Sequence, residues 1–235
     1  MTACDWPGPP MRPNQYSRSR FQLFVTGRSR PEAVAHTASP SSILMRHNQR
    51  PVERCNHMNL HTQHGLITVA DEPTYSFNSA DNARSYAFEI LLTDDSISSI
   101  HGVRLNGDFI VVVGAGGGGS TVHAHSALII DDRLLMAVGD HVACISLVHP
   151  YRLLWSLRVD IATCFGLYWQ NQQRALISHG ELVISRLSTD GRLIWQASGA
   201  DIFSEGFGLL PDHVKAVDFN QSVYRFDYAT GELLP

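Results

Sequence analysis

The chain has 235 residues, of which 44% are hydrophobic and 17% charged, and its formal net charge is −4. This balance excludes a disordered protein, because enough apolar side chains are present to build a core. No apolar run approaches the roughly 18 to 20 residues that span a bilayer, and the first residues lack the compact apolar segment of a secretory signal. We therefore expect a soluble, cytoplasmic protein that does not enter a membrane.

Residues 1–57 differ in composition from the rest of the chain. They hold eight arginines, three acidic residues and seven of the eleven prolines, whereas residues 58–235 hold 10 basic and 19 acidic residues. Three interpretations fit: a basic tail that contacts nucleic acid or membrane, an organellar targeting segment, or a disordered or spurious extension ahead of a true start at Met45 or Met58. We favour the extension. The acidic remainder is predicted to be a β-rich repeat domain that does not bind nucleic acid.

The first part of this domain contains two clear strand signals and one ambiguous stretch. Leu66–Ala70 is a short β-like run, and Phe109–Val113 is a β-branched run after the turn Asn106–Asp108. Residues 79–93 fit one face of a helix, but Tyr86–Leu92 fits a strand equally well, and we favour the strand.

The remainder is dense in β signals. Ala127–Ile130 and Leu134–Val138 flank an Asp-Asp-Arg turn and predict a hairpin. Further strands are predicted at 142–147, 182–187, 192–195 and 223–226. Turn signals recur roughly every 8 to 12 residues, a spacing typical of sandwiches, barrels and propellers. The predicted fold is all-β: a propeller-like or sandwich array of antiparallel strand units after an irregular N-terminal segment.

An internal repeat supports such an array. Gly139–Leu147 leads to Trp155 as Gly180–Leu187 leads to Trp195, and the two tryptophans are 40 positions apart. A looser third copy begins at Asp212 and ends near Leu234. Each unit is predicted to be a small sheet with one tryptophan filling the gap to its neighbour, because a large aromatic side chain joins units that lack a core of their own.

Ser188–Trp195 and Asp227–Leu233 resemble the blade motif of quinoprotein-type (PQQ-like) β-propellers. In that family, an aspartate and a glycine form the turn before a strand that ends in a docking tryptophan. Asp190, Gly191 and Trp195 match this pattern; Asp227 and Gly231 match, but the chain reaches Pro235 without a tryptophan. The resemblance covers residues 139–235 and implies four to five blades at about 40 residues each over the whole domain. It maps no cofactor-binding residue onto this chain.

Two motifs are candidates for chemistry. Gly114, Gly116 and Gly119 satisfy G-x-G-x-x-G, but a strand-like segment follows them where a phosphate site needs a helix, so we favour a flexible or closely packed β-loop. His123 and His125 are two apart, which on a strand places both imidazoles on one face. With a turn histidine such as His141, they predict a divalent metal site; His101, His179 and His213 are alternative third ligands.

Four cysteines without a C-x-x-C pair fit a reducing compartment, although a bridge between Cys144 and Cys164 stays open. The leading functional interpretation is a non-enzymatic β-repeat protein without a cofactor that binds a protein partner through its loops. The alternative is a metal-dependent enzyme or metal-binding protein that uses His123 and His125. An incomplete ring would leave strand edges open, which predicts a homo-oligomer or edge pairing.

Overall fold

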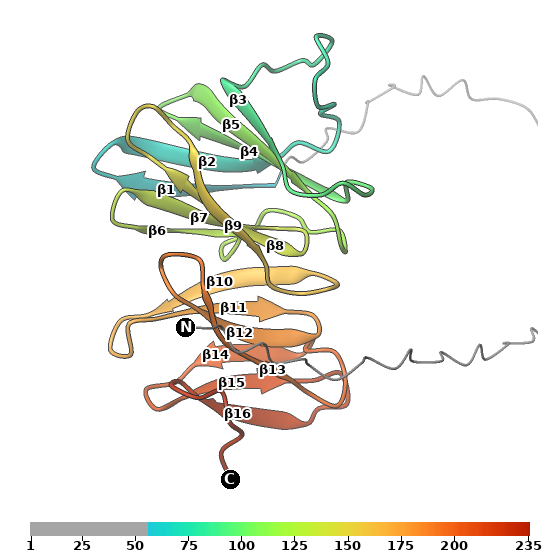
Figure 1. Ribbon diagram of the computed structural model, residues 1–235, viewed down its shortest axis with the longest axis vertical. Helices are drawn as coiled ribbons and strands as arrows, with labels where there is room; N and C mark the ends of the chain where they lie inside the picture. Colours follow the sequence, from blue (N-terminus) through green and yellow to red (C-terminus); the bar gives the residue numbers. More distant parts are fainter. Residues whose placement is uncertain (1–55) are drawn as a thin grey trace, which may run out of the picture. The chain divides into compact units, whose positions relative to one another are not determined.

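A computed structural model describes residues 56–235, and these form sixteen strands in four small sheets with no helix among them (Figure 1). The all-β prediction is therefore confirmed. β1 begins at His57, one residue before the predicted domain boundary. The predictions about residues 1–55 lie outside the described residues.

The first sheet has the strand order β1-β2-β4-β5-β3. Four of its strands are antiparallel neighbours, whereas the short β3 runs parallel to β5. Asn106 and Gly107 connect β4 to β5 with positive φ angles of 54° and 98°, the combination that a tight two-residue hairpin requires. The strands are β1 (His57–Thr62), β2 (Gly65–Asp71), β3 (Phe88–Leu91), β4 (Ser99–Leu105) and β5 (Asp108–Ala115).

The other three sheets are simple meanders in which consecutive strands pair antiparallel. The second holds β6 (Ala127–Ile130), β7 (Arg133–Val138), β8 (His141–Ser146) and β9 (Leu153–Arg158). The third holds β10 (Cys164–Gln170), β11 (Ala175–Gly180), β12 (Val183–Leu187) and β13 (Leu193–Ser198). The fourth holds β14 (Gly206–Leu209), β15 (His213–Val217) and β16 (Val223–Asp227). These strands confirm the predicted hairpin at 127–138 and the strands predicted beyond it.

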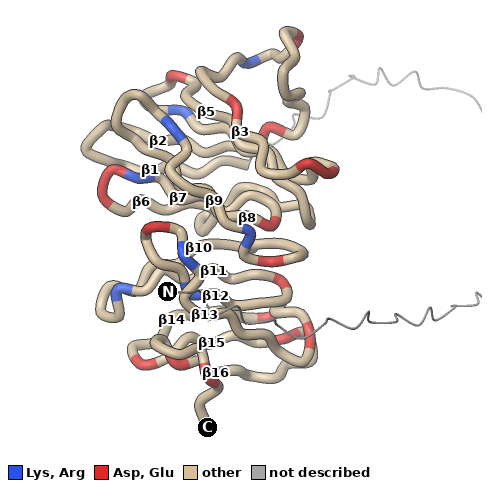
Figure 2. The backbone as a smooth tube through the Cα atoms, viewed as in Figure 1, with Lys and Arg blue, Asp and Glu red and all other residues tan. Residues whose placement is uncertain are grey.

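The core is divided among the junctions of successive sheets. One buried cluster joins side chains of the first two sheets, a second joins the second and third, and a third joins the third and fourth. Cys144 and Cys164 are free thiols buried in the second of these clusters. Acidic residues lie mainly in the connecting loops and at strand ends (Figure 2). The loops thus carry most of the negative charge, while the sheets supply the apolar surface.

The repeated tryptophans join neighbouring sheets as predicted. The Trp155 indole nitrogen donates to the Thr189 carbonyl in the turn after β12, and Trp195 donates in the same way to Tyr228 after β16. Each indole also lies against the glycine of that turn: a Cβ on Gly191 would approach Trp155 to 2.5 Å, and one on Gly231 would approach Trp195 to 2.6 Å. Both glycines have positive φ, so the turn and the close contact each require the missing side chain.

Three sequence-based expectations need correction. The third repeat copy does not correspond to the other two in strand position. Asp212–Phe219 covers β15, the second strand of its sheet, whereas Gly139 and Gly180 each precede the third strand of theirs. Within the ambiguous segment 79–93, only Phe88–Leu91 forms a strand, and it pairs parallel rather than antiparallel. Residues 122–126, expected to be a strand, form a turn, so β6 begins only at Ala127. No helix that is long and apolar enough to cross a membrane occurs in the part of the chain described here.

Candidate functional site

The predicted histidine pair lies in the turn before β6, so strand alternation does not orient it. His123 Nε2 lies 2.6 Å from the Phe165 carbonyl oxygen, and the His125 amide donates to His123 Nδ1 at 3.2 Å. Because Nδ1 accepts a hydrogen bond, Nε2 carries the ring hydrogen and donates it to Phe165. Both nitrogens of His123 therefore have protein partners. The His125 ring stacks on Tyr168, with centroids 4.3 Å apart.

The third predicted ligand, His141, is held elsewhere by Asp140, with 2.6 Å between Nδ1 and Oδ1. Within residues 56–235, no three or more His, Cys, Asp or Glu side chains are grouped so as to hold a metal ion. The structure thus brings His123 and His125 together without a third ligand, and the metal site stays a prediction.

The glycine run after β5 is a closely packed loop. The Gly118 amide donates to the Ala162 carbonyl, and the Ser120 amide donates to Ser99 Oγ. A Cβ on Gly117 would lie 2.3 Å from the Ala162 carbonyl oxygen. Because the backbone here bonds to neighbouring strands and loops, the run allows the sheets to approach one another.

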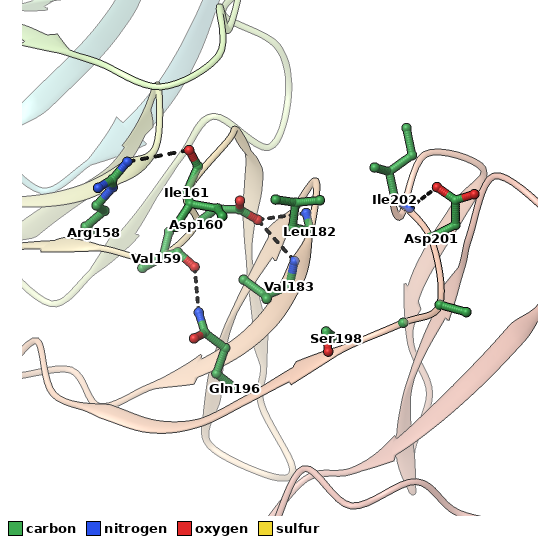
Figure 3. A pocket seen from close by; sticks show the side chains of 12 residues that line it. Arg158, Val159, Asp160, Ile161, Leu182, Val183, Gln196, Ser198, Asp201 and Ile202 are labelled. Atoms are coloured by element: carbon green, nitrogen blue, oxygen red, sulfur yellow. Dashed lines mark hydrogen bonds between the residues drawn. The ribbon is translucent and has the colours of Figure 1, made fainter. Parts of the chain in front are cut away.

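A different site stands out, formed by loops that sequence reasoning did not select. A recess of about 500 Å³ lies between the segment that follows β9, the start of β12 and the segment that follows β13 (Figure 3). We call it the recess. Its lining comprises Arg158–Ile161, Leu182, Val183, Gln196 and Ser198–Ile202.

Asp160 fixes the floor of the recess. Its Oδ1 accepts the Ala162 amide at 2.7 Å, and its Oδ2 accepts the amides of Leu182 and Val183 at 2.9 and 3.1 Å. The carboxylate therefore ties the loop after β9 to the β11–β12 turn of the next sheet. With three amide donors and only 3% of the residue exposed, Asp160 acts as a structural anchor rather than as a free acceptor.

Three further polar side chains of the recess are also bonded within the protein. Gln196 donates through Nε2 to the Val159 carbonyl and to Ser185 Oγ. Arg158 Nε lies 2.7 Å from Asp140 Oδ2. Asp201 accepts the Ile202 amide on one oxygen and an amide hydrogen of Asn220 on the other. These groups hold the recess in shape and leave little polar capacity directed at a ligand.

The rim, by contrast, is apolar and exposed. Ile161 is 73% exposed, the largest exposed fraction among the bulky apolar side chains of the described residues. Ile202 lines the recess and is half-buried. Its carbonyl accepts the amide of Phe219, whose side chain is 61% exposed. The segments after β9 and β13 thus place two apolar side chains, Ile161 and Ile202, in the lining of one hollow, and Phe219 follows as an exposed neighbour of Ile202 outside that lining. Exposed apolar groups at a hollow are expected where a partner's side chain enters a pocket.

Two buried histidines have lowered pKa values. His179, on β11, donates through Nε2 to the Phe203 carbonyl next to the recess, and burial lowers its pKa to about 4. His101, on β4, is fully buried, and burial lowers its pKa to about 4 as well. Its Nδ1 has no hydrogen-bond partner in the described part of the chain. Both imidazoles are neutral at pH 7.

Neither Asp160 nor the apolar rim was found from sequence. An aspartate two residues after a strand resembles any turn former, Phe219 is a single apolar residue between polar ones, and Ile161 has only Ala162 as an apolar neighbour. Their roles depend on which loops come together. The exposure of Ile161 and Phe219 is visible only in the structure.

No protein-family model matches this chain, and no curated protein matches it. It resembles two solved structures of computationally designed proteins. Ika4 shares 11% identity with a TM-score of 0.40, over 51% of this chain and 78% of that one. Ika8 shares 13% identity with a TM-score of 0.42, over 61% of this chain and less than half, 46%, of that one. Similarity at this level says nothing about function.

Proposed function

We propose that this protein is a non-enzymatic β-repeat protein that binds a protein partner through the loops around the recess. One observation carries the proposal: the exposed Ile161 and the half-buried Ile202 line a hollow in which the side chains of Asp160, Gln196 and Asp201 already have hydrogen-bond partners within the protein. An apolar anchor side chain can enter such a hollow without leaving a buried polar group unpaired.

The expected partner is a segment with one apolar anchor flanked by basic side chains. Residues 58–235 carry 19 acidic against 10 basic residues, and the exposed Asp201 lines the recess. Opposite charges at the edge of an interface favour encounter and orientation, while the apolar anchor supplies most of the binding free energy. The resemblance to PQQ-like propellers also stays a proposal; the two tryptophan–glycine contacts support it.

The test is a selection of random displayed peptides on the full-length purified chain, followed by affinity measurements on variants. We expect enriched peptides to share an apolar residue with basic neighbours. Their affinity should fall about tenfold or more for Ile161→Glu, which places a charge in the apolar lining, and about threefold for Phe219→Ala, which removes an exposed apolar side chain next to Ile202.

Leu91→Ala is the matched control, because Leu91 is a comparably exposed apolar residue on β3 of the first sheet. The Leu91→Ala variant should bind the enriched peptides with the same affinity as the unaltered chain. Peptides without a common anchor, or affinities unaffected by both recess substitutions, would show the proposal to be wrong. Thermal unfolding of each variant separates lost binding from lost folding.

A further inference from the structure

A second hollow, of about 580 Å³, lies beside the first sheet, away from the loops that line the recess. The end of β2, the segment before β4 and the loop after the glycine run enclose it. We call it the Asp71 hollow; its lining includes Asp71, Pro73, Ile97, Ile100, Ser120 and Thr121.

Asp71 has unused hydrogen-bonding capacity. Its Oδ1 accepts the Val122 amide at 2.8 Å and lies 3.4 Å from His101 Nε2. Its Oδ2 forms no hydrogen bond within residues 56–235, although only 14% of the side chain is exposed. A partly buried carboxylate oxygen of this kind accepts strongly once a donor reaches it.

The charge of Asp71 is also poorly compensated. Burial is the largest cause that raises the pKa of this carboxyl, and the neighbouring Glu72 raises it further, while the Val122 amide and His123 act in the opposite direction. Glu72 itself is paired with Arg84 and bonded to Tyr86. His101 is neutral at pH 7 because burial lowers its pKa to about 4, so it supplies no positive charge. A bound cation would supply the missing positive charge.

The serine hydroxyl groups of the hollow are already used. Ser98 Oγ donates to the carbonyls of Ala115 and Gly118, and Ser99 Oγ accepts the Ser120 amide. They offer little to a polyol. Ile97, which is 38% exposed, and Ile100 instead provide an apolar wall.

We propose that the Asp71 hollow binds a small organic cation, a primary ammonium on an apolar carbon body, with the ammonium at Asp71 Oδ2 and the carbon body against Ile97 and Ile100. This site is independent of the recess and of the partner proposed to bind there. Three ammonium hydrogens supply the donor that Oδ2 lacks and the positive charge that the site lacks.

The experiment titrates the isotope-labelled full chain with benzylamine and, separately, with its neutral analogue benzyl alcohol, and follows backbone amide NMR shifts. We expect shifts centred on Asp71, Ser99 and Ser120, and binding of the amine at least tenfold tighter than that of the alcohol. Asp71→Asn retains an acceptor for the Val122 amide but removes the charge, so amine affinity should fall about tenfold to the level of the alcohol.

Asp108→Asn is the matched control, because Asp108 is an exposed acid at the start of β5 and the net charge changes equally. It should leave amine affinity unchanged. Ile97→Ala is a second variant that keeps the carboxylate; it should weaken both compounds severalfold. Equal affinity for amine and alcohol, unchanged affinity in Asp71→Asn, or shifts centred elsewhere would overturn the proposal.

Discussion

Asp160 in the recess and Asp71 in its hollow are both acids at or just beyond the end of a strand, yet their surroundings differ. Asp160 accepts three backbone amides, whereas Asp71 accepts one and leaves an oxygen without a donor. The first carboxylate therefore joins two sheets, and the second remains available to a ligand. Residue type and position along a strand do not distinguish these roles. The number of backbone amides that neighbouring loops donate to each carboxylate distinguishes them.

The largest difference between the two aspartates should appear in stability. Asp160→Ala leaves three amides without their acceptor, and we expect it to lower the free energy of unfolding by about 3 kcal/mol, at roughly 1 kcal/mol for each lost bond. Asp71→Ala removes one amide bond and should cost only about 1 kcal/mol. Urea unfolding followed by tryptophan fluorescence measures both; equal losses would remove the distinction.

Lowering the pH should reduce the free energy of unfolding through two buried histidines, His101 and His179. His101 and His179 have a pKa of about 4 in the folded protein, against an ordinary value of 6.5. The unfolded chain therefore binds more protons between these values, so stability is lost as the pH falls from 6.5 to 4 and changes little below that. Each histidine contributes a loss of up to about 3 kcal/mol, from 1.36 kcal/mol per pKa unit.

Urea unfolding at pH 7, 5.5 and 4.5 checks this expectation. His101→Gln and His179→Gln should each flatten the pH dependence, because glutamine does not titrate. A free energy of unfolding that stays constant between pH 7 and 4.5 in the unaltered chain would contradict the prediction.

Within the recess, the hydrogen bonds of Gln196 should also contribute to stability. Gln196→Ala removes hydrogen bonds to the Val159 carbonyl and to Ser185 Oγ, and we expect a loss of about 1 to 2 kcal/mol in the free energy of unfolding. Gln196→Glu keeps the shape but has no amide hydrogens to donate, so it should lose at least as much. Chemical denaturation of both variants shows whether the donor or the volume of the side chain matters.

The smallest effect on stability is expected at the rim. Ile161→Ala and Phe219→Ala truncate side chains that are mostly exposed, so each should change the free energy of unfolding by less than about 0.5 kcal/mol. The same measurement made alongside the peptide affinities tests whether the rim serves binding rather than folding. A loss of 2 kcal/mol or more would assign these side chains to the core instead.

Much of the local structure was predictable because its causes are local. The Asp-Asp-Arg turn between two apolar runs gave the β6–β7 hairpin, and its Asp131 adopts the positive φ that such turns need. The repeated tryptophans indicated contacts between units, which the Gly191 and Gly231 turns complete. The errors occurred where pairing is not local: β3 finds a parallel partner in β5, and residues 122–126 form a turn although they resemble a strand.

The sequence by itself determined that this chain is a series of strand units joined by tryptophans, because period-two apolar runs, turn residues and large aromatics act over short distances. Only the tertiary structure decided the sites. It brought the loops after β9 and β13 around one apolar-rimmed recess and placed Asp71 next to a loop that supplies one donor, not three. Most hydrogen-bond partners of these two carboxylates come from residues distant in sequence, and no local pattern records them.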